Sequence, residues 1–248
     1  MKAAAIIQAR MGSSRLPGKS LMEVGGRPML GLVIERLRRS ARLEDIVVAT
    51  SGEDEDDAIA ALCMDMDAAV ARGSKSDVLG RFAAACALTD ADVIVRVTAD
   101  CPFIDAGLID AALSVWAPGI DRLSAGNDSG YPLGVNAEIV TRAALLTAAA
   151  EATENFEREH VTPFLYTRPE RFRLETLPAP EALRRPHYRL CVDEPADLAM
   201  VRALAARLDD PVAAELAQVI AVLDAAPEIA GMNAGVVQKG FRETETPR

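Results

Sequence analysis

The sequence predicts a three-layer α/β/α sandwich around a mostly parallel β-sheet. Apolar runs with the length of buried strands lie at 2–8, 46–50 and 92–99. Segments with the apolar periodicity of helices separate these runs, an alternation typical of parallel sheets whose crossover helices cover both faces. Because such sheets bind ligands beyond the carboxyl ends of their strands, we expect a functional site where these runs end.

Local signals predict the helices of the first half. Pro28 is expected to open a helix that reaches residue 39, with apolar residues every three or four positions. The adjacent acids at 53–57 suit the first turn of the next helix, because carboxylates are favoured at the positive end of the helix dipole. Five neighbouring acids cannot converge on one metal ion. A strand at 68–71 and a helix at 76–88, capped by Ser76 or Asp77, complete this half.

The second half departs from this alternation. Short segments punctuated by Gly and Pro at 121–140 predict a small β-rich extension, which we expect to serve as a flap or dimerisation surface. One domain is expected over 1–226, and the composition of 227–248 predicts a loosely held tail. The other expected elements are helices at 142–152, 156–167 (bent or divided at Pro163), 195–208 and 212–225, and strands at 171–177 and 187–193.

The loop after the first strand has the features of a phosphate-binding loop. Arg10, Arg15 and Lys19 fall within ten residues of a chain whose formal net charge is −10. Glycines let the backbone approach a phosphate closely and cations neutralise its charge, so the loop is predicted to bind a triphosphate. It is not a Walker A loop, because five residues rather than four separate Gly12 from Gly18, and no G-x-G-x-x-G follows the strand.

Two carboxylates are expected at the same edge of the sheet. Asp100 and Asp193 each follow a predicted strand and precede a proline by two residues. Each taken alone could be a helix N-cap. Beside a triphosphate loop, however, transfer to a nucleotide phosphate needs a hard cation with oxygen ligands, so the pair is predicted to hold Mg²⁺.

The stretch from Ile6 to Lys19 (Ile-Ile-Gln-Ala-Arg-Met-Gly-Ser-Ser-Arg-Leu-Pro-Gly-Lys) resembles the signature loop of nucleotidyltransferases that make activated sugars. It looks most like the SpsF-like branch of the cytidylyltransferases, which are related to the synthetases of CMP-linked acidic sugars. The resemblance covers residues 3 to about 208. It implies a Rossmann-like fold of the nucleotide-diphospho-sugar transferase type, CTP as the nucleotide, Mg²⁺ as cofactor and a homodimer.

The resemblance also implies roles for individual residues. The segments 95–102 and 189–198 are similar to the two metal-binding stretches of the family, which implicates Asp100 and Asp193, and 72–82 is similar to an element near the nucleotide. Arg72 could equally be a surface residue. Lys19, Arg10, Arg15 and Asp100 are the expected catalytic residues. The expected nucleotide-binding residues are Gln8, Ala9, Arg10, Gly12, Ser13, Arg15, Lys19, Arg72, Ser76, Asp77 and Thr98.

Two further matches concern the acceptor. Residues 131–138 resemble the family pattern Tyr-Pro-x-Gly-x-Asp-x-Glu, except that Asn136 stands at the acidic position, which implies a changed substrate preference or reduced activity. Residues 158–163 match Arg-Glu-His-Val-Thr-Pro of the SpsF-like branch, in which Arg158 is expected to hold a substrate carboxylate and His160 to donate a hydrogen bond. The expected acceptor-binding residues are Tyr131, Gly134, Asn136, Glu138, Arg158, Glu159 and His160.

Composition excludes several other classes of function. The acidic balance argues against non-specific binding to nucleic acids or anionic membranes. The four cysteines are scattered without metal-binding spacing, as expected for reduced thiols of a cytoplasmic protein. No apolar run approaches the roughly 18 residues that a membrane span needs.

The sequence therefore predicts an enzyme that transfers CMP from CTP to an acidic sugar or a similar small anionic acceptor for a surface glycan, with release of pyrophosphate. A glycosyltransferase that uses nucleotide sugars is one alternative, and its Asp-x-Asp metal motif has the spacing of Asp90 and Asp92 and of Asp65 and Asp67. Both pairs precede a strand, at the wrong end for the site. A non-catalytic nucleotide- or sugar-binding protein is the other alternative, favoured only by Asn136.

Overall fold

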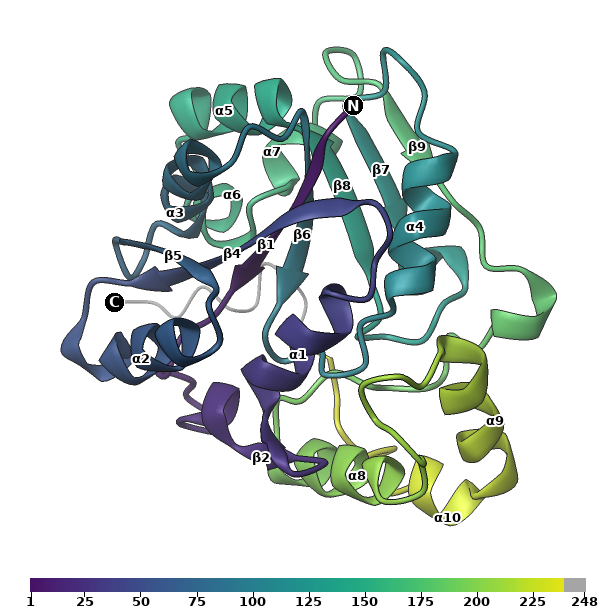
Figure 1. Cartoon of the computed structure of the whole chain (residues 1–248). Helices are drawn as coiled ribbons and strands as arrows, with labels where there is room; N and C mark the ends of the chain where they lie inside the picture. Colours follow the sequence, from purple (N-terminus) through teal and green to yellow (C-terminus); the bar gives the residue numbers. More distant parts are fainter. Residues whose placement is uncertain (239–248) are drawn as a thin grey trace.

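The computed structural model describes residues 1–238 and contains a central seven-stranded sheet in the order β5-β4-β1-β6-β8-β7-β9 (Figure 1). β8 runs antiparallel to both of its neighbours, and the other pairs are parallel. The strands are β1 (Ala3–Gln8), β4 (Leu43–Ser51), β5 (Ala69–Gly73), β6 (Val93–Thr98), β7 (Arg122–Ala125), β8 (Ala137–Thr141) and β9 (Leu174–Thr176), with a separate ribbon of β2 (Glu23–Val24) and β3 (Arg27–Pro28). The predicted mostly parallel sheet is confirmed.

Helices cover both faces of this sheet, as the fold class requires. The helices are α1 (Met29–Leu37), α2 (Asp57–Asp65), α3 (Val78–Ala85), α4 (Ala106–Ser114), α5 (Arg142–Glu151), α6 (Asn155–His160), α7 (Pro163–Tyr166), α8 (Pro195–Ala205), α9 (Leu216–Ala225) and α10 (Pro227–Ala230). Alternate residues of β1 belong to different cores. Ile7 packs with residues of α1, α4, α8 and α9, whereas Ile6 packs with residues of α3, α5 and α7. This alternation is what a strand buried on both faces produces.

The segment 121–140 does not form a separate extension, contrary to the sequence-based prediction. Its two strands, β7 and β8, belong to the central sheet, in which Ile94 of β6 is paired with Val140 and Leu123 of β7 with Ile139. Charged residues of these strands form ion pairs within the sheet, so the segment lacks the continuous apolar run expected of a buried strand.

Two other predicted boundaries need correction, and one is confirmed. The segment 187–193 is extended but forms only an isolated bridge between Arg189 and Leu133, because it lies beside a loop rather than a strand. The division expected at Pro163 within 156–167 is confirmed, because Val161, whose φ is 71°, ends α6, and α7 begins at Pro163. The predicted tail begins with α10 and includes Asn233, which is only 4% exposed, whereas residues 239–248 lie outside the described residues.

Among residues 1–238, no helix combines the length and apolar character that crossing a membrane would require.

Candidate active site

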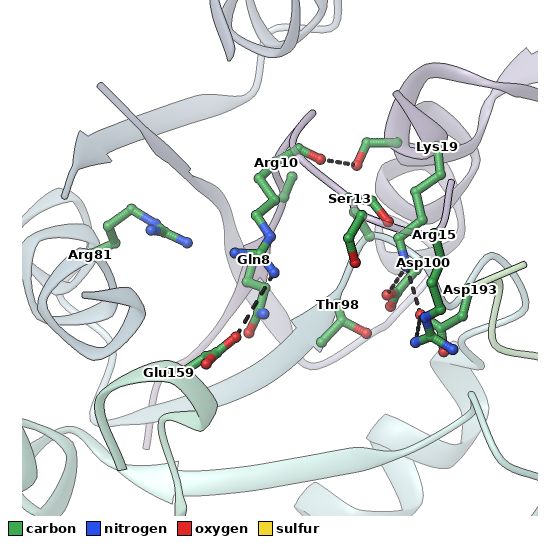
Figure 2. Close-up of a pocket in the computed structure, with 14 residues that line it drawn as sticks. Gln8, Arg10, Ser13, Arg15, Lys19, Arg81, Thr98, Asp100, Glu159 and Asp193 are labelled. Atoms are coloured by element: carbon green, nitrogen blue, oxygen red, sulfur yellow. Dashed lines mark hydrogen bonds and ion pairs between the residues drawn. The ribbon is translucent and has the colours of Figure 1, made fainter. Parts of the chain in front are cut away.

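A cavity of about 370 Å³ opens at the carboxyl ends of β1 and β6, where the sequence predicts the site (Figure 2). Polar and charged side chains from the loop after β1, from β6 and from the segment before α8 converge on it. The lining residues are Gln8, Ala9, Arg10, Ser13, Ser14, Arg15, Lys19, Ser20, Arg81, Thr98, Ala99, Asp100, Glu159 and Asp193.

Hydrogen bonds fix the backbone of the loop between β1 and Lys19. Asp56, which is 1% exposed, accepts a hydrogen bond from the Met11 amide at 2.7 Å and another from the Ser51 amide at 3.0 Å. At the other end, Gly18 has a φ of 74° and its amide donates to the Met11 carbonyl at 2.9 Å. Such a φ favours glycine. One carboxylate of the acidic stretch 53–57 therefore anchors the loop, a role that helical patterning did not indicate.

Lys19 joins the two carboxylates that the sequence predicts as metal ligands. Its Nζ donates to Asp100 Oδ2 at 2.7 Å, to Asp193 Oδ1 at 2.9 Å and to the Val192 carbonyl at 2.7 Å. Burial alone would lower the pKa of Lys19, but the charges of Asp100 and Asp193 outweigh it and raise this pKa above its ordinary value. At neutral pH, Lys19 is therefore a buried cation between two anions.

The N-cap interpretation of the two aspartates is wrong. Asp105 caps α4, with its Oδ1 accepting from the Leu108 amide at 2.7 Å, and Glu194 is the N-cap residue of α8. Asp193 is instead directed toward the cavity, where Arg15 Nη2 lies 3.2 Å from its Oδ1. Neither aspartate is needed for a helix end, so both are available to a ligand.

A buried network of hydrogen bonds fixes the position of Asp193. Arg189 Nη2 donates to Asp193 Oδ2 at 2.8 Å, and Arg189 Nε donates to Asp197 Oδ1 at 2.8 Å. Asp197 is fully buried and also accepts from the Asp193 amide at 2.9 Å. Asn233 Nδ2, from the segment after α10, donates to Asp197 Oδ1 at 2.9 Å and to the Arg189 carbonyl at 3.0 Å. The C-terminal segment thus supports the residue predicted to bind metal.

We expect Asn233→Ala to lower the free energy of unfolding by about 1–3 kcal/mol, because it removes the side-chain donor to the Arg189 carbonyl and one of the two donors to the buried Asp197 Oδ1. Urea unfolding of the full chain measures this effect. The matched control is Asn155→Ala at an exposed position, which should change stability by less than about 0.5 kcal/mol. Equal effects of the two variants would contradict the proposed support.

Arg81 lines the cavity but is not among the individual residues expected to bind, although it lies in the segment 72–82 that resembles an element near the nucleotide. It is 2% exposed, and its Nη1 donates to the carbonyls of Ser74 at 2.5 Å and Lys75 at 3.0 Å. Within residues 1–238, its Nε has no hydrogen-bond partner. Figure 2 places Arg81 at the opposite end of the cavity from Lys19, with Arg10 between them. The sequence did contain a signal for this role, because Arg81 is a cation on the apolar face of the predicted helix 76–88.

Several expected nucleotide-binding residues do not line this cavity. Arg72 is held by Asp57 Oδ1 at 2.6 Å and by the Ser51 carbonyl at 2.9 Å. Asp77 caps α3 and pairs with Arg158, whose Nε and Nη2 donate to it at 3.0 and 2.6 Å. Asp77 and Arg158, expected to bind nucleotide and acceptor respectively, thus bind each other. Gly12 and Ser76 also lie outside the lining.

Of the expected acceptor-binding residues, only Glu159 lines the cavity, where it lies 3.9 Å from Arg10 Nη2. Glu138 is paired inside the sheet with Arg96 at 2.7 Å and Arg122 at 2.5 Å. Tyr131 is buried and lines a separate cavity of about 630 Å³ beside α4 and α9.

The other three members of the acceptor set also lie outside the cavity. Gly134 has a φ of 98°, and a Cβ there would lie 2.5 Å from the Cys191 amide nitrogen, so it allows two loops to approach closely. Asn136 is exposed, and His160 is half-buried at the end of α6.

The donor set fits Mg²⁺. Carboxylate oxygens of Asp100 and Asp193 converge on one point, the Lys19 nitrogen, beside an open polar cavity, and carboxylate oxygens are the ligands that Mg²⁺ prefers. The Asp-x-Asp motif of the alternative glycosyltransferase function, Asp90 and Asp92, does not line this cavity. Asp92 lies at the start of β6, where it accepts from the Lys2 amide at 2.8 Å.

Comparison with known proteins agrees with this geometry. Residues 4–225 match the family model described as Cytidylyltransferase. The chain belongs to the cytidylyltransferase family. It is 34% identical over 234 residues to the spore coat polysaccharide biosynthesis protein SpsF of Bacillus subtilis, which covers 91% of this chain and 95% of that protein. The resemblance noted in the sequence is therefore confirmed.

Two further relatives of the family extend over nearly all of this chain. An uncharacterized protein of Methanocaldococcus jannaschii is 40% identical over 246 residues, which is 99% of this chain and 100% of that protein. The solved structure of a cytidylyltransferase from Leptospira borgpetersenii has a TM-score of 0.88 at 29% identity, over 97% of this chain and 100% of that chain. The Rossmann-like fold predicted from the sequence is confirmed.

Proposed function

We propose that the protein transfers the CMP moiety of CTP to an acidic sugar or a similar small anionic acceptor, with release of pyrophosphate, in the synthesis of a surface polysaccharide. Membership of the cytidylyltransferase family supports the reaction class. The role of the SpsF relative in spore coat polysaccharide biosynthesis and the resemblance to synthetases of CMP-linked acidic sugars support the acceptor class.

One observation carries this proposal. Three cations of the loop after β1 and two carboxylates from separate elements line one cavity at the carboxyl ends of the strands. Cations clamp the oxygens of a triphosphate, and positioning with charge neutralisation is most of what phosphoryl and nucleotidyl transfer require. A non-catalytic binding protein would have no need of paired metal ligands beside such a loop.

The residues that line the cavity have different proposed roles. Arg10 and Arg15 would bind phosphate oxygens of CTP, and the acceptor oxygen would attack the α-phosphorus as pyrophosphate leaves. Lys19 donates to both carboxylates and would supply positive charge beside the leaving group. Asp100 and Asp193 would hold Mg²⁺, which when bound neutralises phosphate charge in the transition state. Arg81 lies far enough from Lys19 to bind another part of the nucleotide or the acceptor.

Pyrophosphate release tests the proposal. The full chain is incubated with Mg²⁺, each of the four NTPs in turn and a panel of acidic sugars, with Asp100→Ala as control. We expect release with CTP and one acceptor and its loss in the variant. If no acceptor supports release, CTP binding is measured directly. If none of the four NTPs binds in the presence of Mg²⁺, the proposal is wrong.

Arg81→Met is expected to raise the KM for CTP about tenfold or more, because a hydrogen bond to a charged group contributes about 1.5–3 kcal/mol. Initial rates at varied CTP concentration measure this change. Arg42→Met, at an exposed position, is the matched control and should leave KM unchanged. An unchanged KM in Arg81→Met would exclude Arg81 from nucleotide binding.

The homodimer implied by the family resemblance stays a prediction. Sedimentation of the purified chain measures the oligomeric state.

A further inference from the structure

In Asp100 and in Asp193, one carboxylate oxygen accepts a hydrogen bond from Lys19 and the other lies near a cysteine thiol. Asp100 Oδ2 accepts from Lys19, while its Oδ1 lies 3.7 Å from Cys101 Sγ. Asp193 Oδ1 accepts from Lys19, while its Oδ2 lies 3.8 Å from Cys191 Sγ. The Sγ atoms of Cys101 and Cys191 and a carboxylate oxygen of Asp100 all lie within 4.8 Å of one another.

We propose that Cys101, Cys191 and Asp100 form a binding site for a thiophilic divalent cation such as Zn²⁺, distinct from the all-oxygen set of Asp100 and Asp193 but sharing Asp100 with it. Two sulfur donors and one carboxylate are a ligand set that suits Zn²⁺ and is a poor one for Mg²⁺. Three protein ligands leave a fourth position for water. Binding releases the two thiol protons to the solvent.

The distances suit a single ion. Tetrahedral Zn²⁺, with bonds of about 2.3 Å to sulfur and about 2.1 Å to oxygen, separates its donors by about 3.6–3.8 Å. The donor atoms already lie within 4.8 Å of one another, so small side-chain rotations bring them onto one ion. Cys191 is half-buried and Cys101 is buried, with 9% of its surface exposed.

Backbone hydrogen bonds hold the donor segments together. The Val192 amide, next to Cys191, donates to the Asp100 carbonyl at 2.8 Å, and the Leu190 amide donates to the Leu133 carbonyl at 2.7 Å. Cys101 is oriented by Thr98 Oγ1, which lies 3.1 Å from its sulfur. A donor set fixed by its surroundings loses less entropy when an ion binds than one that must be assembled.

This site would regulate the reaction if the proposed function is correct, because the two metal sites share Asp100. A bound thiophilic ion withdraws Asp100 from the Mg²⁺ set and adds positive charge beside Lys19. We therefore expect low concentrations of Zn²⁺ to inhibit CMP transfer even in the presence of excess Mg²⁺.

Spectroscopic titration with Co²⁺ tests the site without any substrate. The reduced, metal-free full chain is titrated with Co²⁺, and the thiolate-to-cobalt charge-transfer band and the visible d–d bands are recorded. We expect both bands to saturate at one ion per chain and to be removed by added Zn²⁺. Cys191→Ala should abolish the charge-transfer band or reduce it to that of a single thiolate, whereas Cys63→Ala, which removes a buried thiol of α2, should leave it unchanged.

Absence of the charge-transfer band from the unmodified chain, or the same band in Cys191→Ala, would overturn the site. Circular dichroism checks that each variant is folded. In the activity assay, Cys191→Ala should raise the Zn²⁺ concentration for half-inhibition about tenfold or more, while Cys63→Ala should not. A chain that shows the cobalt bands but releases no pyrophosphate with any NTP would keep the thiolate site and contradict the proposed function, so the two can fail separately.

Discussion

Replacing Lys19 with methionine (Lys19→Met) is expected to lower Mg²⁺-dependent pyrophosphate release by about a thousandfold or more. The variant removes the only group that donates to both Asp100 and Asp193 among the hydrogen bonds of the described residues. It also removes a buried positive charge that lines the cavity proposed to bind the triphosphate. Methionine has a similar length without the charge, so the comparison isolates the ammonium group.

The same variant should make stability depend on Mg²⁺. Without Lys19, the half-buried Asp100 and the buried Asp193 face each other with less compensating charge, and the native state is destabilised by their repulsion. An ion that binds only the native state stabilises it, by about 2.7 kcal/mol at a concentration of 100 Kd. The melting temperature of Lys19→Met should therefore rise with Mg²⁺ more than that of the unmodified chain.

Lys2→Met is the matched control for these measurements. Lys2 lies at the opposite end of β1 and its Nζ pairs with Asp90 at 3.1 Å, with half of its side chain exposed. Its removal should leave both pyrophosphate release and the Mg²⁺ response unchanged. If Lys19→Met keeps more than about a tenth of the activity, Lys19 has no direct part in the transfer.

Glu138→Gln is expected to cost about 3–5 kcal/mol of the free energy of unfolding, because it leaves two arginines in the sheet without their counter-ion. The Glu138 side chain is 12% exposed and pairs with Arg96 at 2.7 Å and with Arg122 at 2.5 Å. Thr162 Oγ1 also donates to it at 2.9 Å. Arg96 Nη2 in turn donates to Gln8 Oε1 at 3.2 Å, so the loss should extend to the floor of the cavity.

Glu151→Gln provides the comparison at the surface. Glu151 pairs with Arg171 at 2.7 Å, but its side chain is 46% exposed, and exposed pairs contribute at most about 1 kcal/mol. Urea unfolding of both variants measures the difference. A loss in Glu138→Gln no larger than that in Glu151→Gln would show that the buried group of charges does not hold the sheet together.

The pH dependence of the free energy of unfolding should also identify the contribution of Glu138. Burial alone would raise the pKa of Glu138, but Arg96 and Arg122 outweigh it and lower this pKa from 4.5 to about 2. A depressed pKa gives stability that is present above the ordinary pKa and is lost as the pH falls toward the folded one. The stability difference between the unmodified chain and Glu138→Gln should therefore shrink between about pH 5 and pH 2.

Three residues expected to bind the nucleotide or the acceptor have partners within the chain, for a common reason. Arg158 and Asp77 each have the chemistry of a ligand-binding residue, yet they bind each other across 81 positions of the chain. Glu138 matched a family pattern at the acceptor site, but two arginines of neighbouring strands take up its charge. A residue type indicates what a side chain can bind, and only packing decides which partner is nearest.

The sequence by itself determined the layered α/β fold and the family, and it predicted the edge of the sheet at which the candidate cavity lies. These depend on local patterns: the length of apolar runs, the loop from Gln8 to Lys19, and the rule that ligands bind at the carboxyl ends of parallel strands. The tertiary structure alone decided that Lys19 joins Asp100 and Asp193, that Arg81 enters the cavity and that two thiols lie together. Lys19 and Asp193 are 174 positions apart, and no local pattern encodes a contact that forms only when the sheet and its helices pack.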